Sequence, residues 1–552
     1  MSQTSSAPLD SSLFDDDAVF VVSLNSVIRE ETLDYIESMD TEFPPEPARA
    51  EAELLLKITR RIEKHNTEAK PAHKILPPTT LNPWQVAQLI AARHRVVRIT
   101  PSDRNSDDSL DVLALYQDEG PDEGIYSTSE TQLRQLARSY DLSLSTRSFL
   151  EVIEALREIA PRVPGTADPD LIAVDNGIFD YRTKQLLEFS PDHVFLSKCR
   201  VPYQEAAQNV VIHNDEDGTD WDVETWMSEL HDDADVVQLL WEALGACIRP
   251  NVSWDKALWL YSEEGSNGKG TYCALARNLV GAGSWASIAL ADFSRDFLLE
   301  PLTRASAIIV DENDVGGFID RAANLKAIIT NDVILVNRKY KPAISFQFRG
   351  FMIQCLNEFP RSRDKSESFY RRQLFVPMNK NFKGVERRYI KSDYLHRPEV
   401  LQYVLKRVLH MNYHALSTPA AAAAILNEYK EVNDPVREFW NTHKDDFVWD
   451  FLPFPWLHAL YSGWNQKANP KGGTVSQKRF TQEITALAAR EGTWRSDQLA
   501  PGPRLKQAEP LSVLYGLGEP WVDSTISAAG FHRKGTPSPT NMAPKYRGLV
   551  RI

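Results

Sequence analysis

The stretch Leu258–Gly281, LWLYSEEGSNGKGTYCALARNLVG, has the pattern of a buried strand, a glycine-rich turn and a helix. In a phosphate-binding loop of the form G-x-x-x-x-G-K-[ST], backbone N–H groups surround the phosphates at a helix N-terminus, and the lysine reaches the β and γ oxygens. Lys269 stands in the position of that lysine. The context therefore predicts a nucleotide site in an α/β core. A glycine-rich turn without a ligand is the alternative.

The loop departs from this pattern at two positions. Glu263 replaces the first glycine, and Gly270 replaces the hydroxyl residue after the lysine. Gly265 can supply the flexibility of the turn, and Thr271 offers a hydroxyl one residue late as a candidate Mg²⁺ ligand. The residues expected to contact the nucleotide are Gly265, Ser266, Asn267, Gly268, Lys269, Gly270 and Thr271.

The composition is that of a globular protein with several cores. Its 552 residues are 42% hydrophobic and 25% charged, with a formal net charge of −14. This charge argues against wholesale coating of a polyanion but leaves a local basic channel open. The four cysteines include no C-x-x-C pair, which excludes a zinc ribbon of paired cysteines and indicates reduced thiols. No apolar run approaches the ~20 residues of a membrane span, so we expect a soluble intracellular protein with no membrane partner.

Composition and periodicity divide the chain into six segments. We expect a multidomain α/β protein with a disordered tail (1–18), a helical N-terminal region (19–80), an α+β module (81–250), an α/β core with the phosphate loop (251–395), a helical segment with a linker (396–434) and a small C-terminal domain (435–552). The Asn176-Gly177 pair predicts a β-hairpin within 170–204. VNDPV at 432–436 reads as the linker.

Three later motifs follow the loop in the order that an ATPase site requires. Asp311 and Glu312 follow an apolar strand, where carboxylates hold Mg²⁺ and polarise the attacking water. Asn357 ends another apolar strand, at the edge where open α/β sheets bind ligands. Arg371 and Arg372 precede a further strand and suit a finger for the γ-phosphate of a neighbouring subunit. An acidic turn, an Asn cap and a surface ion pair are the separate alternatives, and the shared order favours one site.

Two β-rich runs, Val333–Val336 and Ile344–Phe348, enclose a basic tip. A hairpin with cations and an aromatic ring in a central pore grips single-stranded DNA through phosphate charge and stacking. A solvated hairpin end is the alternative. The candidate DNA-binding residues are Arg338, Lys339, Tyr340 and Lys341. The most basic part of the chain, Arg361–Lys391, is interpreted as a subunit interface or a pore lining.

These motifs resemble those of the superfamily 3 helicases, and more closely the helicase part of phage and plasmid primase-helicases, a group that includes the poxvirus primase-helicase. EGSNGKGT resembles their Walker A motif and AIIVDEND their Walker B motif. LKAIITNDVILVNRKYKP is similar to the segment with the DNA-gripping hairpin, FMIQCLNEFPRSRD to the sensor strand and FYRRQLFVP to the arginine-finger strand. Glu263 and Gly270 depart from the family's Walker A motif.

The resemblance implies an ATP-dependent replicative DNA helicase of a phage, plasmid or integrated element, located in the cytoplasm of a bacterial host cell. It implies an AAA+-like P-loop core that assembles into a ring, a hexamer, and moves 3′→5′ on single-stranded DNA. ATP and Mg²⁺ are the implied cofactors. Lys269 would hold the phosphates, and Asp311 would position Mg²⁺.

The resemblance also implies roles for the remaining motif residues. Glu312 would orient the attacking water, Asn357 would sense the γ-phosphate, and the neighbouring subunit would supply Arg371 or Arg372. The sequence has no D-x-D and His constellation of a primase. A separate primase or polymerase is therefore an expected partner.

The last segment resembles the winged-helix domain of the same helicases. Its helix pattern places on one face Phe480, Ile484, Leu487 and Ala488. Lys478 and Arg479 lie at the start of that helix, behind Ser476 as a candidate N-cap. The closing strands add His532, Arg533, Lys534, Lys545 and Arg547. Duplex DNA and a protein surface are both candidate partners of this domain.

Two other functions stay open from the sequence alone. A ring ATPase that translocates on DNA, or that remodels an origin as an initiator, would keep the same motifs without unwinding. A non-catalytic DNA-binding scaffold would bind nucleotide without turnover. A decayed site of that kind would not be expected to keep Asp311, Glu312, Asn357 and the arginine pair together.

Overall fold

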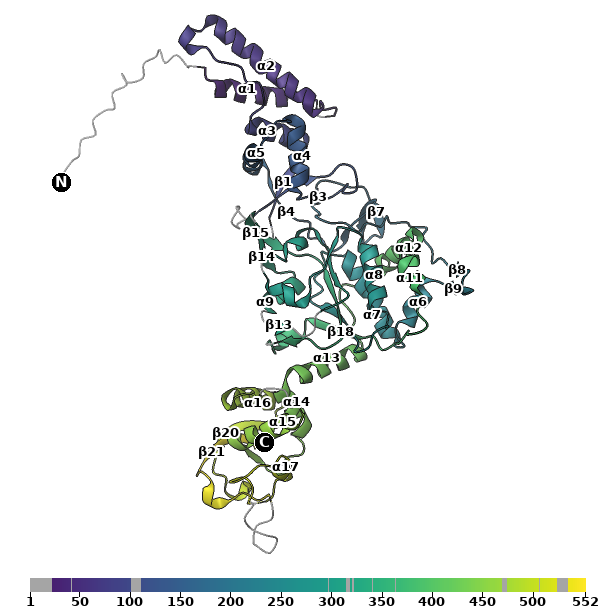
Figure 1. Cartoon of the computed structure of the whole chain (residues 1–552), viewed down its shortest axis with the longest axis vertical. Coiled ribbons are helices and arrows are strands. Elements are labelled where there is room, and N and C mark those ends of the chain that lie inside the picture. The colour runs from purple at the N-terminus through teal and green to yellow at the C-terminus, as the bar shows by residue number, and fades with distance from the viewer. Residues whose placement is uncertain are drawn as a thin grey trace, which may run out of the picture.

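The computed structural model describes residues 22–40, 42–100, 111–295, 297–313, 318–319, 322–339, 341–362, 364–468, 474–505, 507–523 and 535–552. The expected tail (1–18), Tyr340, His532, Arg533 and Lys534 lie outside the described residues. Figure 1 shows an elongated arrangement, with N-terminal helices at one end, a large sheet with its helices in the middle, and the C-terminal domain at the other end. No helix in the described part of the chain is long and apolar enough to cross a membrane.

The N-terminal region combines helices with a four-stranded sheet. Its helices are α1 (Leu24–Glu37), α2 (Pro47–Glu68), α3 (Pro83–Arg93), α4 (Glu130–Tyr140) and α5 (Thr146–Ile159). The sheet has the order β3–β2–β1–β4 and contains β1 (Val96–Thr100), β2 (Val112–Tyr116), β3 (Tyr126–Ser127) and β4 (Arg162–Pro164). One hydrophobic cluster extends from Val27 to Ala160, so the helices before and after residue 80 share a core.

A second β module leads into the core. The strands β5 (Leu171–Val174) and β6 (Gly177–Asp180) pair antiparallel, which confirms the hairpin predicted at Asn176-Gly177. β7 (Gln185–Leu187) extends this sheet, and β8 (Ile212–Asn214) pairs with β9 (Thr219–Trp221). The helices α6 (Val223–Glu229) and α7 (Ala234–Ile248) follow.

Neighbouring strands of the central five-stranded sheet all run parallel, in the order β11–β12–β16–β10–β18. The strands are β10 (Ala257–Tyr261), β11 (Trp285–Ala286), β12 (Ala307–Val310), β16 (Phe351–Leu356) and β18 (Gln373–Pro377). Alternate residues of β10 pack on opposite faces: Leu258 lies in one hydrophobic cluster and Trp259 in the other. Burial on both faces is typical of parallel sheets and explains the continuous apolar runs. The predicted α/β arrangement of this region is confirmed.

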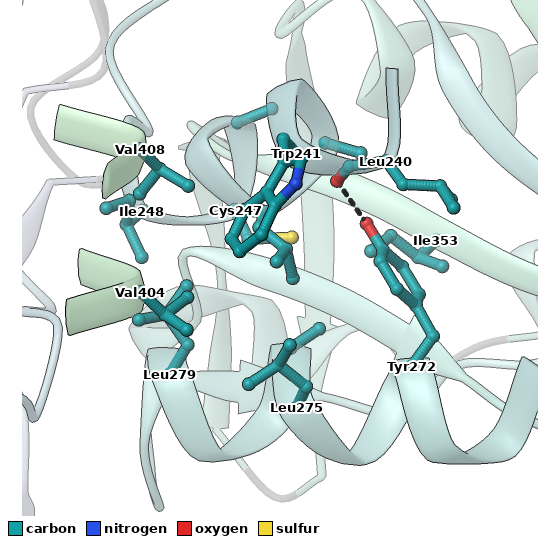
Figure 2. Close-up of a cluster of buried hydrophobic side chains, with 14 of the residues drawn as sticks. Leu240, Trp241, Cys247, Ile248, Tyr272, Leu275, Leu279, Ile353, Val404 and Val408 are labelled. Carbon is teal, nitrogen blue, oxygen red and sulfur yellow. Dashed lines mark hydrogen bonds between the residues drawn. The ribbon is translucent and has the colours of Figure 1, made fainter. Parts of the chain in front are cut away.

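One face of the sheet is covered by α7, α8 (Lys269–Val280) and α12 (Pro398–Leu409). Figure 2 shows how side chains from these helices interlock in the core, among them Trp241, Leu275, Leu279, Val404 and Val408. The Tyr272 hydroxyl donates a 2.7 Å hydrogen bond to the Leu240 carbonyl, so the buried phenol is satisfied. This bond ties α8 to α7.

The other face carries α9 (Ala322–Ile329) and an antiparallel hairpin of β14 (Val333–Arg338) and β15 (Lys341–Gln347). The predicted hairpin is confirmed, but its strands are longer than expected. Arg338 pairs with Lys341 in the ladder, so two of the four expected tip residues belong to strands. A short helix, α10 (Glu367–Tyr370), precedes β18, and the short strands β13 (Phe318–Ile319) and β17 (Arg361–Ser362) pair beside the core.

The C-terminal domain packs helices against a three-stranded sheet. Its elements are α14 (Pro435–His443), α15 (Phe454–Ala468), α16 (Gln477–Glu491), α17 (Pro510–Leu514), and β19 (Phe451–Pro453), β21 (Tyr546–Arg551) and β20 (Trp494–Leu499) in that sheet order. The predicted apolar face of α16 is confirmed, because Phe480, Ile484 and Ala488 are buried. Ser476 occupies the N-cap position, although its side chain makes no capping hydrogen bond.

The expected linker at 432–436 is a one-residue joint between two helices. The helix α13 (Ala420–Asn433) ends just before Asp434, and α14 begins just after it. Asp434 is buried and accepts a 3.1 Å hydrogen bond from Lys365 of the core. Nearby, Glu367 accepts hydrogen bonds from Lys430, Arg437 and Arg490 at 3.2–3.4 Å. These charge pairs fix the joint to the core. The linker prediction missed this structure because Asp434 acts as the N-cap of α14.

Candidate functional site

The turn between β10 and α8 has a backbone that few residues other than glycine adopt. Gly268 has a φ of +86°, and Ser266 also has a positive φ of 57°. A Cβ added at Gly268 would lie 2.8 Å from Leu230 of the helix α6 region, so space and conformation both require glycine there. The Phe382 amide donates to the Ser266 carbonyl at 2.7 Å and fixes the turn from outside. The helix α8 then runs from Lys269 to Val280, and Gly281 is its C-cap residue.

The Lys269 side chain folds over the carboxyl edge of the sheet. It is 7% exposed, and its ammonium donates to three oxygens: Ser262 O at 3.0 Å, Leu356 O at 3.2 Å and Asn357 Oδ1 at 2.8 Å. Burial lowers the pKa of Lys269 below its ordinary value. Among the residues that the structure describes, no carboxylate pairs with this ammonium. The site therefore holds a buried cation with neutral neighbours, which favours an anionic ligand.

The parallel register brings the predicted residues to one edge of the sheet. Tyr261 pairs with Leu356, so the loop and Asn357 leave adjacent strands side by side. Val310 pairs with Gln354 on the next strand, which places Asp311 along the same edge. Parallel strands expose their carboxyl ends together, and this is where open α/β sheets bind ligands. Lys269, Asn357 and Asp311 are thus gathered by topology.

Asp311 is held by an arginine that the sequence reasoning missed. Both of its carboxylate oxygens accept from Arg277 of α8, one of them from Nη1 at 3.1 Å. The hydrogen bonds from Arg277 lower the pKa of Asp311, so it is ionised at neutral pH. The only sequence signal for this pair was a basic residue in the last turn of α8.

The donor set around the loop suits a metal ion that arrives with a nucleotide. Asp311 follows β12, Glu312 beside it is exposed, and Thr271 lines a cavity next to the loop. Within the described residues no group of three or more His, Cys, Asp or Glu side chains forms a metal cage. Mg²⁺ in nucleotide sites takes one or two carboxylates together with phosphate oxygens and water. The residues present fit that mode of binding.

The arginine pair lies at the opposite edge of the same sheet. The Ala257 amide donates to the Arg372 carbonyl at the start of β10, whereas the phosphate loop follows the end of that strand. Five strand residues span roughly 16 Å, so neither arginine reaches the loop of its own chain. Arg372 donates to Ser368 Oγ at 2.7 Å, while Arg371 is exposed. Arg371 is the arginine that is available to a second molecule.

A cavity of about 750 Å³ opens beside the loop. Its apolar walls come from Trp226, Leu230, Phe382, Val385 and Ile390, and its basic residues are Arg387, Arg388 and Lys391. The run Arg361–Lys391 is predicted to form a subunit interface or a pore lining, and three of its cations line this cavity. The volume is in the range of small-molecule and cofactor sites. The lining also includes the carboxylates of Glu229 and Glu386. The apolar wall suits a heterocycle, and the three cations suit phosphates.

The hairpin tip lies against the N-terminal region. Arg338 lines a cleft of about 1360 Å³ together with Glu130 of α4 and Glu300. Burial lowers the pKa of Arg338, and the two carboxylates oppose that effect. Lys339 is exposed. Of the expected DNA-binding residues, the structure thus turns Arg338 toward its own chain and leaves Lys339 at the surface.

The predicted cations of the C-terminal domain are distributed over several elements. Arg479 forms a 2.8 Å ion pair with Glu483 one turn later on α16. Lys478 lies beside it on the same helix, and Lys545 and Arg547 belong to the closing strand region. These four positions are the described part of the expected basic surface.

Family models match three separate segments of the chain. Residues 116–232 match the "D5 N terminal like" model, 260–372 match a "Family of unknown function (DUF5906)", and 431–499 match the "Poxvirus D5 protein-like" model. The middle segment contains the phosphate loop, Asp311, Asn357 and both arginines. The two D5 matches support a primase-helicase-like chain of the D5 type, in agreement with the motif resemblance.

The chain matches no protein in the curated set. Among solved structures, the A form of the apo NrS-1 C-terminal region is similar at 15% identity with a TM-score of 0.42, covering 86% of this chain and 99% of that one. A second A-form structure, of residues 305–718, has 13% identity and a TM-score of 0.40, covering 86% of this chain and 100% of that one.

Proposed function

We propose that this chain is the subunit of a ring-forming, ATP-dependent DNA helicase of the superfamily 3 type that acts in DNA replication. One observation carries the proposal: Lys269 of the glycine-rich loop and Asn357 of the neighbouring strand meet at 2.8 Å on the carboxyl edge of a parallel sheet. That pair is what a phosphate-binding lysine and a γ-phosphate sensor require. The D5-type matches support the link to DNA replication.

The residues around the loop divide the work of holding and cleaving ATP. The phosphates would lie over the N-terminus of α8, where backbone N–H groups lack intrahelical partners. Lys269 would exchange its carbonyl partners for phosphate oxygens. Asp311 and Thr271 would hold Mg²⁺, which supplies charge neutralisation when it is bound, and Glu312 would orient the attacking water. The base would lie against Trp226 and Phe382.

The edge position of Arg371 supports a site completed by a neighbouring subunit. A heterologous contact between copies that closes on itself produces a ring, and a hexamer is the state that the resemblance implies. Single-stranded DNA would pass through the ring and contact Lys339 and the rest of the hairpin tip. The proposal also includes an AAA+-like core, movement 3′→5′ along the strand, and a winged-helix C-terminal domain that binds duplex DNA. So does a separate primase or polymerase.

Lys269→Ala tests the site assignment. Wild-type protein is expected to hydrolyse ATP, faster with single-stranded DNA, and to displace a strand from a 3′-tailed fork. The variant is expected to lose both activities. Lys64→Ala, on the exposed side of α2, is the control for loss of a lysine. Full ATP turnover in Lys269→Ala would contradict the site.

The same assays separate the two alternatives. ATP turnover that DNA stimulates without strand displacement would identify a translocase or an origin-remodelling initiator. Nucleotide binding without turnover in the wild type would identify a non-catalytic scaffold. The Lys269–Asn357 contact at the carboxyl edge favours the catalytic function.

A further inference from the structure

The short helix α11 (Arg388–Ser392) is fixed beside the phosphate loop by its own side chains. Ile390 is buried in the core cluster that also contains α8. The Tyr389 hydroxyl donates to Asp217 Oδ2 at 2.7 Å on the opposite flank. Asn278 of α8 donates to the Leu395 carbonyl at 2.8 Å just beyond α11. Contacts on both flanks of α11 therefore set the position of Lys391, which follows Ile390, relative to α8.

The Lys391 ammonium lies next to Gly270, one of the two residues at which the loop departs from the usual pattern. A Cβ built at Gly270 would be 3.5 Å from Lys391 Nζ, an ordinary van der Waals distance. In G-K-[ST] loops this Cβ belongs to the hydroxyl residue that contacts Mg²⁺. A cation from a different element thus lies beside the position where the side chain missing at Gly270 would begin.

Two further facts place this ammonium in the site. Lys391 lines the cavity of about 750 Å³ together with Gly268 and Thr271. Its charge also adds to that of Arg277 in lowering the pKa of Asp311, so it lies within electrostatic range of that carboxylate. Within the described part of the chain, no hydrogen bond or ion pair engages the Lys391 side chain, which is exposed.

We propose that Lys391 is a second phosphate-binding residue, which contacts the β or γ oxygens from the Gly270 side and takes over part of the charge neutralisation that Mg²⁺ supplies in loops with a Ser or Thr there. This inference rests on the proposed nucleotide site. Lys269 would contact the phosphates from the sheet edge and Lys391 from α11. Because ammonium–phosphate contacts are charge-assisted, an ammonium carried by α11 at this position would retain part of the affinity when the metal is removed.

The dependence of nucleotide binding on metal tests the proposal in the full chain. AMP-PNP is titrated calorimetrically in Mg²⁺ and in EDTA with wild type, Lys391→Ala, Lys391→Arg and the control Lys383→Ala, a neighbouring exposed lysine outside the cavity lining. We expect Lys391→Ala to weaken binding by about threefold in Mg²⁺ and by more than about thirtyfold in EDTA. Lys391→Arg is expected to restore most of the affinity in EDTA, and Lys383→Ala to match the wild type.

The outcomes separate this proposal from the site on which it rests. Unchanged binding in Lys391→Ala, or an equal loss with and without Mg²⁺, overturns the role of Lys391 even when Lys269→Ala abolishes binding. A wild type that binds no AMP-PNP in Mg²⁺ overturns the nucleotide site itself. Thermal unfolding of Lys391→Ala is expected to match the wild type because the side chain is exposed, and a lower melting temperature together with failed rescue by Arg would assign it a structural role.

Discussion

Replacing Asn357 by Asp puts a carboxylate in the place of the amide oxygen that lies 2.8 Å from the Lys269 ammonium. Asn and Asp have nearly the same volume, so the change creates neither a cavity nor an overlap. Two unit charges at this distance attract by about 6 kcal/mol at an effective dielectric constant of about 20. Desolvation of the new carboxylate offsets most of this gain. We expect the unliganded protein to become more stable by about 1 kcal/mol.

The same substitution opposes nucleotide binding. To bind the Lys269 ammonium, phosphate oxygens must displace the new Asp carboxylate. They then lie close to its negative charge, which repels them. We expect affinity for AMP-PNP to fall by at least about hundredfold, equivalent to about 3 kcal/mol. Asn357→Ala is the matched comparison, since it removes the acceptor but leaves the Ser262 and Leu356 carbonyls at 3.0 and 3.2 Å. Loss of one charge-assisted hydrogen bond is expected to lower stability by about 2 kcal/mol and to weaken AMP-PNP binding by less than about tenfold.

Thermal unfolding and calorimetric titration of the three proteins measure the two effects separately. The expected order of melting temperatures is Asn357→Asp, wild type, Asn357→Ala, and the expected order of affinities is wild type, Asn357→Ala, Asn357→Asp. Opposite signs of the two effects in one isosteric variant would not arise from a general disturbance of the fold. Wild-type affinity in Asn357→Asp would refute the placement of the phosphates beside Lys269.

Arg371→Ala is expected to reduce DNA-stimulated ATP turnover by about 10³-fold at an unchanged melting temperature, because Arg371 is exposed; retained turnover would assign the finger elsewhere. Arg372→Ala is expected to lower the melting temperature, since its guanidinium bonds Ser368, and an unchanged melting curve would contradict this structural role. Glu367→Gln is expected to lower the melting temperature in dilute buffer and less so in high salt, as surface charge pairs are screened. An equal loss under both conditions would rule out a charge effect. Lys339→Glu is expected to weaken binding of a labelled single-stranded oligonucleotide and to flatten its salt dependence by about one phosphate contact. Unchanged binding would remove the hairpin tip from the DNA path.

The sequence predicted the parts of the site that a single element determines. The local hydrophobic pattern shows where an apolar strand ends. The residue that follows that end lies at the carboxyl edge of the sheet in any arrangement of the other elements. Asp311 and Asn357 were located in this way, and the parallel register then placed them at the edge with Lys269. The hairpin was predicted for the same reason, although its strands extend into the expected tip because Arg338 and Lys341 pair in the ladder.

The parts that were missed depend on contacts between distant elements. Lys391 belongs to a basic run with no local feature that relates it to Gly270, and only the packing of α11 on α8 brings the two together. Arg277 looks like an ordinary cation in the last turn of a helix until β12 places Asp311 beside it. Asp434 was read as part of a linker because Asn, Asp and Pro are turn residues. The same residue types also cap helices. Here the hydrogen bond from Lys365 holds Asp434 in the capping position.

In the proposed mechanism, ATP hydrolysis requires assembly of several subunits, because the sheet separates Arg371 from the phosphate loop of its own chain. Lys269 and Asn357 lie at the carboxyl edge, and Arg371 lies at the amino edge of the adjacent strand pair, roughly 16 Å away along strands of five residues. No rotamer of Arg371 crosses that distance within one chain, so in the proposed ring each subunit would carry one half of two different sites. Lys391, in contrast, lines the cavity beside the loop of its own chain, together with Arg387 and Arg388. A ring built from such subunits would bind nucleotide in isolated copies and hydrolyse it only at the contacts between them.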